Sequence, residues 1–257
     1  MFIFLDSWVG YFFIIQLFFF NQNFDDMITE KEFLYITKLI INNIEGGYYN
    51  PNYHPDPNML DSGETMFGID RRWGGAIPQN QKEYNLFWSK IDAVKNPNTW
   101  KRYYRGGNLE KELTELAAKI EYEQFRKNVK TYIEPYVKSN KGYKNVQNAI
   151  NKYKKVALHF IYATWNGSGR FGQFATMLAN YLSKGMKSED HCFKFCMKCR
   201  RSLGVPLIAK GAGYLEEIVK KESKFFKTSN TKKIILISVL SLALIGTGAF
   251  LVSKFKK

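Results

Sequence analysis

Cysteine and acidic residues are scarce in this sequence of 257 residues. Three cysteines are too few for a disulfide framework, and they leave the redox compartment of the protein open. Because Lys and Arg total 38 against 23 for Asp and Glu, the net charge is +15. The expected partners are therefore polyanions: nucleic acid, anionic lipid or an anionic cell wall. A hydrophobic content of 45% excludes a fully disordered chain and predicts a substantial packed domain.

Alternating strand patterns, internal repeats and a glycine-rich phosphate loop are also missing. Apolar residues instead recur at steps of three and four, the period of a helix with one buried face. Four prolines between residues 46 and 80 predict a loop-rich insert with a short hairpin near residues 65–69. The predicted fold class is mainly α with one small β element. The predicted helices span about residues 28–45, 144–163, 171–184 and 212–226, with a further helix capped by Asn108.

The C-terminal region contains an uncharged apolar run of nineteen residues, 234–252. This length suits the hydrocarbon thickness of a bilayer, so residues 232–257 are predicted to form a transmembrane anchor. A buried core helix is the alternative. Lysines flank both ends of the run, and the positive-inside rule therefore gives no orientation. Residues 186–231 are predicted to form a helical, basic juxtamembrane region, for which anionic lipid is a sufficient partner.

Residues 1–26 form an apolar N-terminal extension rich in phenylalanine. No Lys or Arg precedes Lys31, so the basic start of a secretory signal is missing. The extension is interpreted either as a second membrane segment or as an upstream reading-frame extension, with the natural start at Met27. An amphipathic helix follows Met27, which favours the second interpretation.

Glu45 is the strongest candidate for a catalytic side chain. It closes the first predicted helix, just before two glycines and the pair Tyr48-Tyr49. The negative end of the helix dipole and the apolar neighbours both disfavour the ionised carboxylate. A carboxylic acid that stays protonated near neutral pH can act as a general acid. The competing interpretation is an ordinary solvated glutamate at a helix end.

Two short motifs carry a resemblance to a known family. The chain reads Glu-Gly-Gly-Tyr at residues 45–48 and Asp-Ser-Gly-Glu-Thr-Met-Phe-Gly-Ile at residues 61–69. Both resemble glycoside hydrolase family 108, a family of phage and bacterial N-acetylmuramidases related to lysozyme-like folds. The resemblance covers about residues 27–185 and is more specific in its first half. It implies a lysozyme-like catalytic domain over that range, with residues 63–68 in a small β element that walls the cleft.

The same resemblance suggests roles for the site residues. It implies Glu45 as the catalytic acid, with Glu64 preferred as a second carboxylate and Thr65 placed to orient a water or a substrate hydroxyl. A mechanism that uses Glu45 alone with water also stays open. The candidate substrate-binding residues are Tyr48, Asn50, Asp61, Gly63, Tyr104, Trp165 and Asn166.

Some positions depart from the family pattern. Ser62 stands where the family usually has a glycine, Tyr162 where an acidic residue is expected, and Trp165 where a small aliphatic residue is usual. These departures leave the cleavage residue intact but predict altered substrate binding.

One further cluster has the residue types of a metal site. His191, Cys192, Cys196 and Cys199 lie close together in sequence, but no second ligand pair follows at the usual interval. Free or partly buried thiols are the default interpretation. Neither a metal nor a cofactor is therefore expected, and no nucleic-acid motif accompanies the excess of lysine.

Together these arguments predict a membrane-anchored muramidase. It would hydrolyse the β-1,4 bond between N-acetylmuramic acid and N-acetylglucosamine in peptidoglycan. A phage or mobile-element origin is expected, with the enzyme facing the cell wall or associated with a virion. The alternatives are a lytic transglycosylase that uses the same glutamate, and a non-catalytic virion or envelope protein with a wall-binding domain. A basic nucleic-acid binder ranks third.

Overall fold

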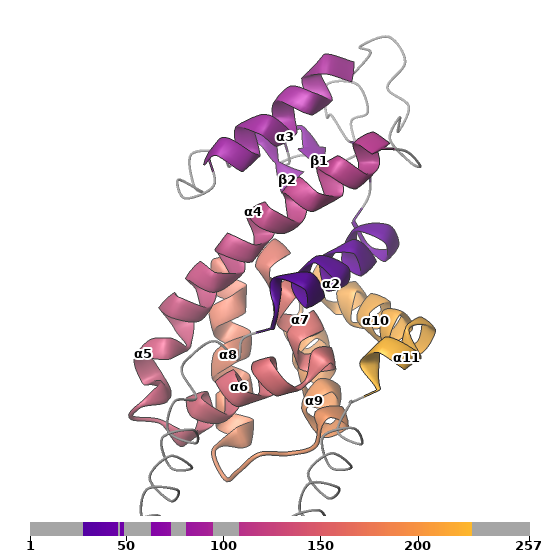
Figure 1. The fold of residues 1–257 in the computed structure, drawn as a ribbon. Helices are drawn as coiled ribbons and strands as arrows, with labels where there is room; N and C mark the ends of the chain where they lie inside the picture. Colours follow the sequence, from indigo (N-terminus) through magenta and orange to yellow (C-terminus); the bar gives the residue numbers. More distant parts are fainter. Residues whose placement is uncertain (1–27, 46, 49–62, 73–80, 95–107, 228–257) are drawn as a thin grey trace, which may run out of the picture. The chain divides into compact units, whose positions relative to one another are not determined.

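The computed structural model describes residues 28–45, 47–48, 63–72, 81–94 and 108–227 (Figure 1). Within these ranges the chain is mainly helical, as predicted, with a single two-stranded hairpin. The elements are α2 (Glu30–Asn43), β1 (Thr65–Met66), β2 (Ile69–Asp70), α3 (Gln81–Val94), α4 (Asn108–Tyr132), α5 (Glu134–Val137), α6 (Lys141–Lys152), α7 (Lys154–Trp165), α8 (Ser168–Leu182), α9 (Glu189–Ser202), α10 (Pro206–Lys221) and α11 (Ser223–Phe226).

The first described helix, α2, agrees closely with its sequence prediction. Its N-terminus carries a capping box, in which the Thr29 side chain accepts from the Glu32 backbone N–H and the Glu32 carboxylate accepts from the Thr29 backbone N–H. Phe33, Ile36 and Ile40 lie on its buried face. The helix ends at Asn43, so that Glu45 follows it by two residues.

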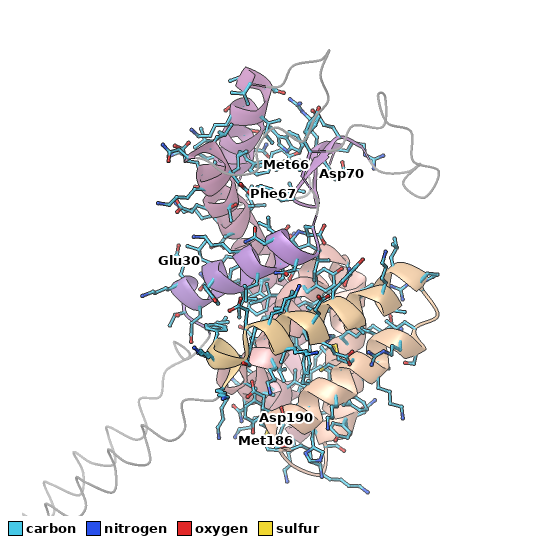
Figure 2. All side chains as sticks on the ribbon, turned by 90° about the vertical axis from the view of Figure 1, so that its right-hand side faces the viewer. Glu30, Met66, Phe67, Asp70, Met186 and Asp190 are labelled. Carbon is cyan, nitrogen blue, oxygen red and sulfur yellow. The ribbon has the colours of Figure 1, made fainter. Side chains whose placement is uncertain are left out.

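The hairpin confirms the small β element predicted between residues 65 and 69. Thr65 pairs with Asp70, and Met66 pairs with Ile69, in an antiparallel register. The two residues between the strands, Phe67 and Gly68, have φ of 53° and 75°. Positive φ at both central positions matches the right-handed twist of a two-residue hairpin. The Met66 and Phe67 side chains at this hairpin are labelled in Figure 2.

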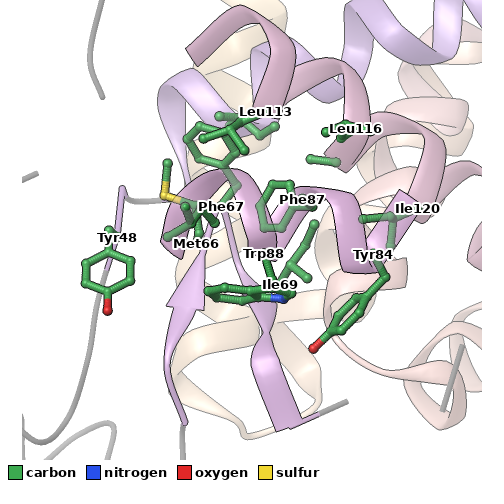
Figure 3. Packing of buried hydrophobic residues seen from close by; sticks show 13 residues of the cluster. Tyr48, Met66, Phe67, Ile69, Tyr84, Phe87, Trp88, Leu113, Leu116 and Ile120 are labelled. Carbon is green, nitrogen blue, oxygen red and sulfur yellow. The ribbon is translucent and has the colours of Figure 1, made fainter. Parts of the chain in front are cut away.

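A hydrophobic cluster joins the hairpin to α3 and α4. Phe67 packs against Phe87 with ring centroids 6.4 Å apart, and Phe87 meets Trp88 edge to face at 5.5 Å. Figure 3 shows these rings beside the two strands. The full cluster is Ile41, Tyr48, Met66, Phe67, Ile69, Tyr84, Phe87, Trp88, Ile91, Leu113, Leu116, Ala117 and Ile120.

The helix α4 also packs against α2, α7 and α8. Its Phe125 ring lies 5.5 Å from Phe33 of α2 and 6.0 Å from Phe171 of α8, measured between centroids. Phe171 in turn meets Phe160 of α7 edge to face at 5.1 Å. These four rings are fully buried, so they form a second apolar centre at which four helices meet.

The helix predicted over residues 144–163 is wrong as a single element, because the structure has two helices there. Tyr153 separates α6 from α7 with an extended backbone, φ −114° and ψ 106°. Its hydroxyl donates to the Lys187 carbonyl oxygen at 2.9 Å. Lys187 belongs to neither α6 nor α7. Apolar periodicity continues across a one-residue break, so the pattern did not reveal it. The helix α3 was also not among the predicted helices.

The chain divides into two compact units, residues 1–218 and 219–257. The first therefore continues past residue 185, where the predicted catalytic domain ended, and includes α9, which packs on α7 and α8. The second unit contains the end of α10 and α11 among its described residues.

No helix in the described ranges is long and apolar enough to cross a membrane. The extension 1–26 and the run 234–252 lie outside those ranges, and the predictions for them stand as predictions.

Candidate active site

Glu45 lies where the end of α2, the hairpin and the end of α7 come together. A Cβ placed on Gly68 would be 2.5 Å from Glu45 Oε2 and 2.7 Å from Trp165 Cδ1. The Glu45 carboxyl and the Trp165 indole therefore both contact the bare backbone of Gly68. Glu45 and Trp165 are half-buried and Gly68 is exposed, so this junction opens to the surface of the unit.

Burial raises the pKa of Glu45 to about 7. The direction agrees with the sequence argument, although the cause differs in part. Desolvation accounts for the shift, whereas the helix dipole had been expected to share it. A carboxyl group with this pKa is largely protonated at slightly acidic pH and half protonated near neutrality, which suits a general acid.

Trp165 is held in place by the hairpin turn. Its indole Nε1–H donates to the carbonyl oxygen of Phe67 at 3.0 Å. Gly68 adopts φ +75° and has no room for a Cβ, so a glycine is required here both by conformation and by contact. The turn thus brings the indole edge beside the carboxyl group of Glu45.

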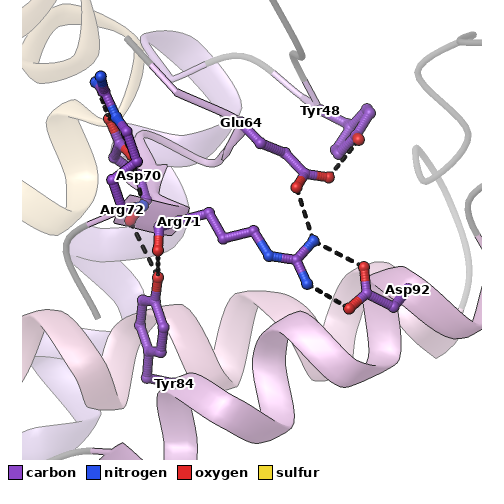
Figure 4. Close-up of polar contacts among 7 residues, drawn as sticks. All are labelled: Tyr48, Glu64, Asp70, Arg71, Arg72, Tyr84 and Asp92. Atoms are coloured by element: carbon purple, nitrogen blue, oxygen red, sulfur yellow. Dashed lines mark hydrogen bonds and ion pairs between the residues drawn. The ribbon is translucent and has the colours of Figure 1, made fainter. Parts of the chain in front are cut away.

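Glu64 lies in a separate polar network on the hairpin side (Figure 4). The Tyr48 hydroxyl donates to Glu64 Oε1, and Arg71 Nη1 lies 2.7 Å from Glu64 Oε2. Arg71 continues to Asp92 on α3, with Nη2 2.5 Å from Oδ2. Both carboxylate oxygens of Glu64 are thus engaged, and the contacts join the segment after α2 to the hairpin and α3. The predicted role of Glu64 as a second catalytic carboxylate stays a prediction.

The outer edge of the hairpin is fixed by Asp70. Its carboxylate accepts from the Gly63 backbone N–H at 3.2 Å and pairs with Arg72 at 2.8 Å. Hydrogen bonds from Arg72 and Gly63 keep the pKa of Asp70 below its usual value against the opposing effect of burial. Thr65 is buried on β1, opposite Asp70 in the register. Thr65 therefore belongs to the small β element, whereas Gly63 lies two residues before its first strand.

Behind Trp165 lies a buried polar network centred on Arg200 of α9. Its guanidinium donates to Asn166 Oδ1 at 2.8 Å, to His159 Nδ1 at 3.0 Å and to the His159 carbonyl oxygen at 3.2 Å. Tyr162 lies against the same group, with the Arg200 Cζ 4.7 Å from its ring centroid. Arg200 is fully buried. This network anchors the end of α7, which carries Trp165 and Asn166.

The charges in this network follow from burial. Burial lowers the pKa of Arg200 to about 10, which still leaves it cationic at neutral pH. The pKa of His159 is well below its ordinary value, because the imidazole is buried and faces Arg200, so it is neutral. Burial, followed by the nearby Glu45 carboxyl, raises the pKa of Tyr162 to about 12. Asn166 was predicted to bind substrate, and in the structure its side-chain oxygen accepts from Arg200.

Sequence reasoning missed Glu121, a buried glutamate on α4. Burial, followed by the charge of Glu45, raises the pKa of Glu121 to about 8. The signal was present in the sequence. Leu113, Ala117 and Glu121 recur at steps of four on the apolar face of the helix predicted from Asn108, so an acidic residue on that face should have been singled out.

Four of the candidate substrate-binding residues remain to be accounted for. Asn50, Asp61 and Tyr104 lie outside the described residues. Tyr48 is buried in the cluster of Figure 3, where its ring packs rather than lining a surface.

The cysteines of the candidate metal motif are free buried thiols. Burial raises the pKa of Cys199 to about 11, so this thiol is protonated at neutral pH. In the part of the chain that the structure describes, no three His, Cys, Asp or Glu side chains are grouped to hold a metal ion.

Comparison with known proteins assigns neither a family nor a function to this chain. No protein-family model, curated protein or solved structure matches this chain at a significant level.

Proposed function

We propose that this protein is a peptidoglycan hydrolase of the N-acetylmuramidase type, with Glu45 as its general acid. The observation that carries the proposal is the junction of Glu45, Gly68 and Trp165. It combines a carboxyl group whose pKa is raised to about 7 with an exposed glycine and a half-buried indole. A desolvated carboxyl group that keeps its proton near neutral pH is what protonation of a glycosidic oxygen requires.

In the proposed reaction, the Glu45 carboxyl donates its proton to the oxygen that links N-acetylmuramic acid to N-acetylglucosamine. The bond between that oxygen and the anomeric carbon breaks, leaving an oxocarbenium-like centre. A water molecule adds to this carbon, and its proton returns to the Glu45 carboxylate. Trp165, fixed by its bond to Phe67, would stack on a sugar ring next to the cleaved bond.

Three features favour peptidoglycan over other glycans. The motifs at residues 45–48 and 61–69 resemble those of family 108, and the mainly helical unit with one small hairpin agrees with a lysozyme-like domain. The net charge of +15 suits an anionic cell wall. The predicted membrane segment 234–252 would hold the enzyme beside that wall.

The proposal is tested by product analysis. The full chain in detergent micelles is incubated with purified peptidoglycan, and soluble fragments are identified by mass spectrometry. Fragments with reducing N-acetylmuramic acid ends are expected from the wild type and not from Glu45→Gln. Glu30→Gln, an exposed change on the same helix, serves as the control and should cleave normally.

Two other outcomes would replace the proposal. Anhydro sugar ends would identify a lytic transglycosylase, in which a substrate hydroxyl attacks in place of water. Sedimentation with peptidoglycan without any fragment release would identify a non-catalytic wall-binding protein.

A further inference from the structure

Positive charge is unevenly distributed over the first compact unit. Residues 141–205, which contain α6 to α9, have twelve Lys and Arg side chains against two acidic ones. Residues 108–140, which contain α4 and α5, have six of each. The excess of lysine is therefore concentrated on particular helices, and the exposed positions of these helices indicate where a polyanion would bind.

The exposed face of α6 carries lysines and no acidic residue. Lys141, Lys144 and Lys152 are exposed and recur with the period of the helix, while Val146 and Ile150 on the opposite side are buried. The helix contains no Asp or Glu at any position. This face thus carries positive charge without an acidic neighbour on the same helix.

The segment that joins α8 to α9 adds two lysines beside this face. Asn145 of α6 donates through Nδ2 to the Leu182 carbonyl oxygen at 2.9 Å, at the end of α8. Tyr153, directly after α6, donates through its hydroxyl to the Lys187 carbonyl oxygen at 2.9 Å. The segment is therefore held against α6 near both of its ends. Lys184 and Lys187 are exposed, and the segment has no acidic residue.

These five lysines form no ion pair with another described residue. The lysines that follow Tyr153 do: Lys154 lies 3.6 Å from Glu32, and Lys155 lies 2.5 Å from Asp190. Lys152 instead places its Nζ 5.9 Å from the centroid of the Tyr153 ring, whose hydroxyl reaches the backbone of the α8–α9 segment. The basic surface defined by the five residues thus keeps its charge available for an external anion. Its members are Lys141, Lys144, Lys152, Lys184 and Lys187.

An apolar side chain lies among these lysines. Met186, labelled in Figure 2, stands between Lys184 and Lys187 in sequence and is 36% exposed. Lysines around an exposed apolar side chain suit a bilayer surface, where the apolar group enters the boundary between headgroups and acyl chains and the ammonium groups bind lipid phosphates. The run 234–252, predicted to span a bilayer, would also keep lipid phosphate at a high local concentration.

We propose that the basic surface binds the phosphates of anionic phospholipids, with Met186 entering the lipid interface. The contact holds this face of the first unit against the bilayer. It lies outside the basic stretch that follows α10, and it does not depend on the proposed peptidoglycan cleavage. Duplex DNA is the competing polyanion, because the same lysines could contact its phosphates.

The first test measures the reactivity of each lysine in the full chain. The protein is placed in lipid nanodiscs made of phosphatidylcholine alone or of phosphatidylcholine and phosphatidylglycerol in equal parts. Acetylation of each lysine is then followed by mass spectrometry. The five lysines should react at least about fivefold more slowly in the anionic discs. High salt should remove the difference, because it screens exposed charges.

Lys82 on α3 and Lys111 on α4 are the internal controls, since both are exposed and lie outside the basic surface. They should react at the same rate in the two kinds of disc. Equal rates for the five lysines in both discs would overturn the proposal. If duplex DNA then protected the five lysines in neutral micelles, the basic surface would be assigned to nucleic acid instead.

The second test follows position 186 directly. Met186→Cys is labelled with a fluorescent dye that responds to polarity, and the native cysteines do not compete because they are buried. The dye emission should shift to the blue in anionic discs, and replacement of Lys144, Lys152 and Lys187 by glutamine should remove the shift. Val94→Cys is the matched control, because Val94 is an apolar residue of α3 that is 45% exposed. Equal emission from position 186 in neutral and anionic discs would refute the proposal.

Discussion

The indole Nε1–H of Trp165 donates to the carbonyl oxygen of Phe67 at 3.0 Å, across 98 residues of sequence. This bond ties the end of α7 to the turn of the hairpin. Because Gly68 follows Phe67, it also places the indole beside the Glu45 carboxyl. The geometry of the candidate acid therefore depends on three segments that are distant in the chain.

A side chain at position 68 is expected to damage the site. In Gly68→Ala the new Cβ would meet both Glu45 and Trp165, and the residue would have to hold φ +75°. We expect a loss of about 1–2 kcal/mol in the free energy of unfolding from the backbone alone. Displacement of Glu45 should lower cleavage about 100-fold. Urea denaturation and fragment release measure the two effects.

The control for this change is Gly213→Ala on α10, where a Cβ would meet nothing within 4 Å. That variant should be as stable as the wild type or slightly more so, because alanine favours the helix. Normal cleavage by Gly68→Ala would contradict the arrangement of Glu45 described above.

Removing the indole N–H of Trp165 is expected to lower both stability and cleavage activity. Trp165→Phe loses the bond to Phe67, which should lower the free energy of unfolding by about 1 kcal/mol. Cleavage should fall about tenfold, equivalent to a barrier increase of about 1.4 kcal/mol. Trp88→Phe is the matched comparison, because Trp88 Nε1 has no partner among the described residues. It should affect stability through packing and through the contact of its ring with Arg71, and equal losses of activity in both variants would argue against a special role of Trp165.

Stability should fall as pH rises toward neutrality. An unfolded glutamate titrates near 4.5, whereas burial raises the pKa of Glu45 to about 7 in the folded protein. Between these values the folded state binds more protons than the unfolded state, so the free energy of unfolding decreases with pH. The contribution is complete below about pH 4.5 and is lost as pH passes 7. Glu45→Gln should therefore be more stable than the wild type at pH 8, by up to about 3 kcal/mol.

Denaturation curves at pH 5 and pH 8 test the direction of this pH dependence. The wild type should lose more stability between the two values than Glu45→Gln does. Equal losses would show that Glu45 ionises freely in the folded protein.

We expect Arg200 to stabilise the end of α7 through its hydrogen bonds. Arg200→Lys cannot reproduce three hydrogen bonds to His159 and Asn166, and it leaves buried acceptors without partners. A destabilisation of about 2–3 kcal/mol is expected. The adjacent Arg201→Lys should change stability by less than about 0.5 kcal/mol, since Arg201 is about half exposed where it pairs with Glu216. Thermal unfolding of the two variants compares them directly.

Local signals in the sequence were enough to predict the position of α2 and of the hairpin. The apolar period and the glycines after Glu45 bounded the helix to within two residues at each end, and the Gly-Glu-Thr-Met-Phe-Gly-Ile stretch contained the turn. These features depend on neighbours within a few residues, which a sequence displays directly.

The rest of the site depends on contacts that no local pattern displays. Glu121 lies 76 positions after Glu45 in the sequence, and its burial follows from the packing of α4 against helices distant in the chain. Arg200 was assigned to a basic region outside the catalytic domain, although it is buried between α7 and α8 side chains. Counting lysines and arginines cannot tell a buried guanidinium from a solvated one.

The most direct test of the account is the clearing of a peptidoglycan suspension at pH 6, where Glu45 is mostly protonated. The full-length wild type, Glu45→Gln and Glu64→Gln are compared at equal concentration. Wild type and Glu64→Gln should clear the suspension, while Glu45→Gln should be at least about 100-fold slower, because glutamine cannot supply the proton. Clearing by Glu45→Gln at the wild-type rate would contradict the account, and clearing lost only in Glu64→Gln would move the acid to that residue.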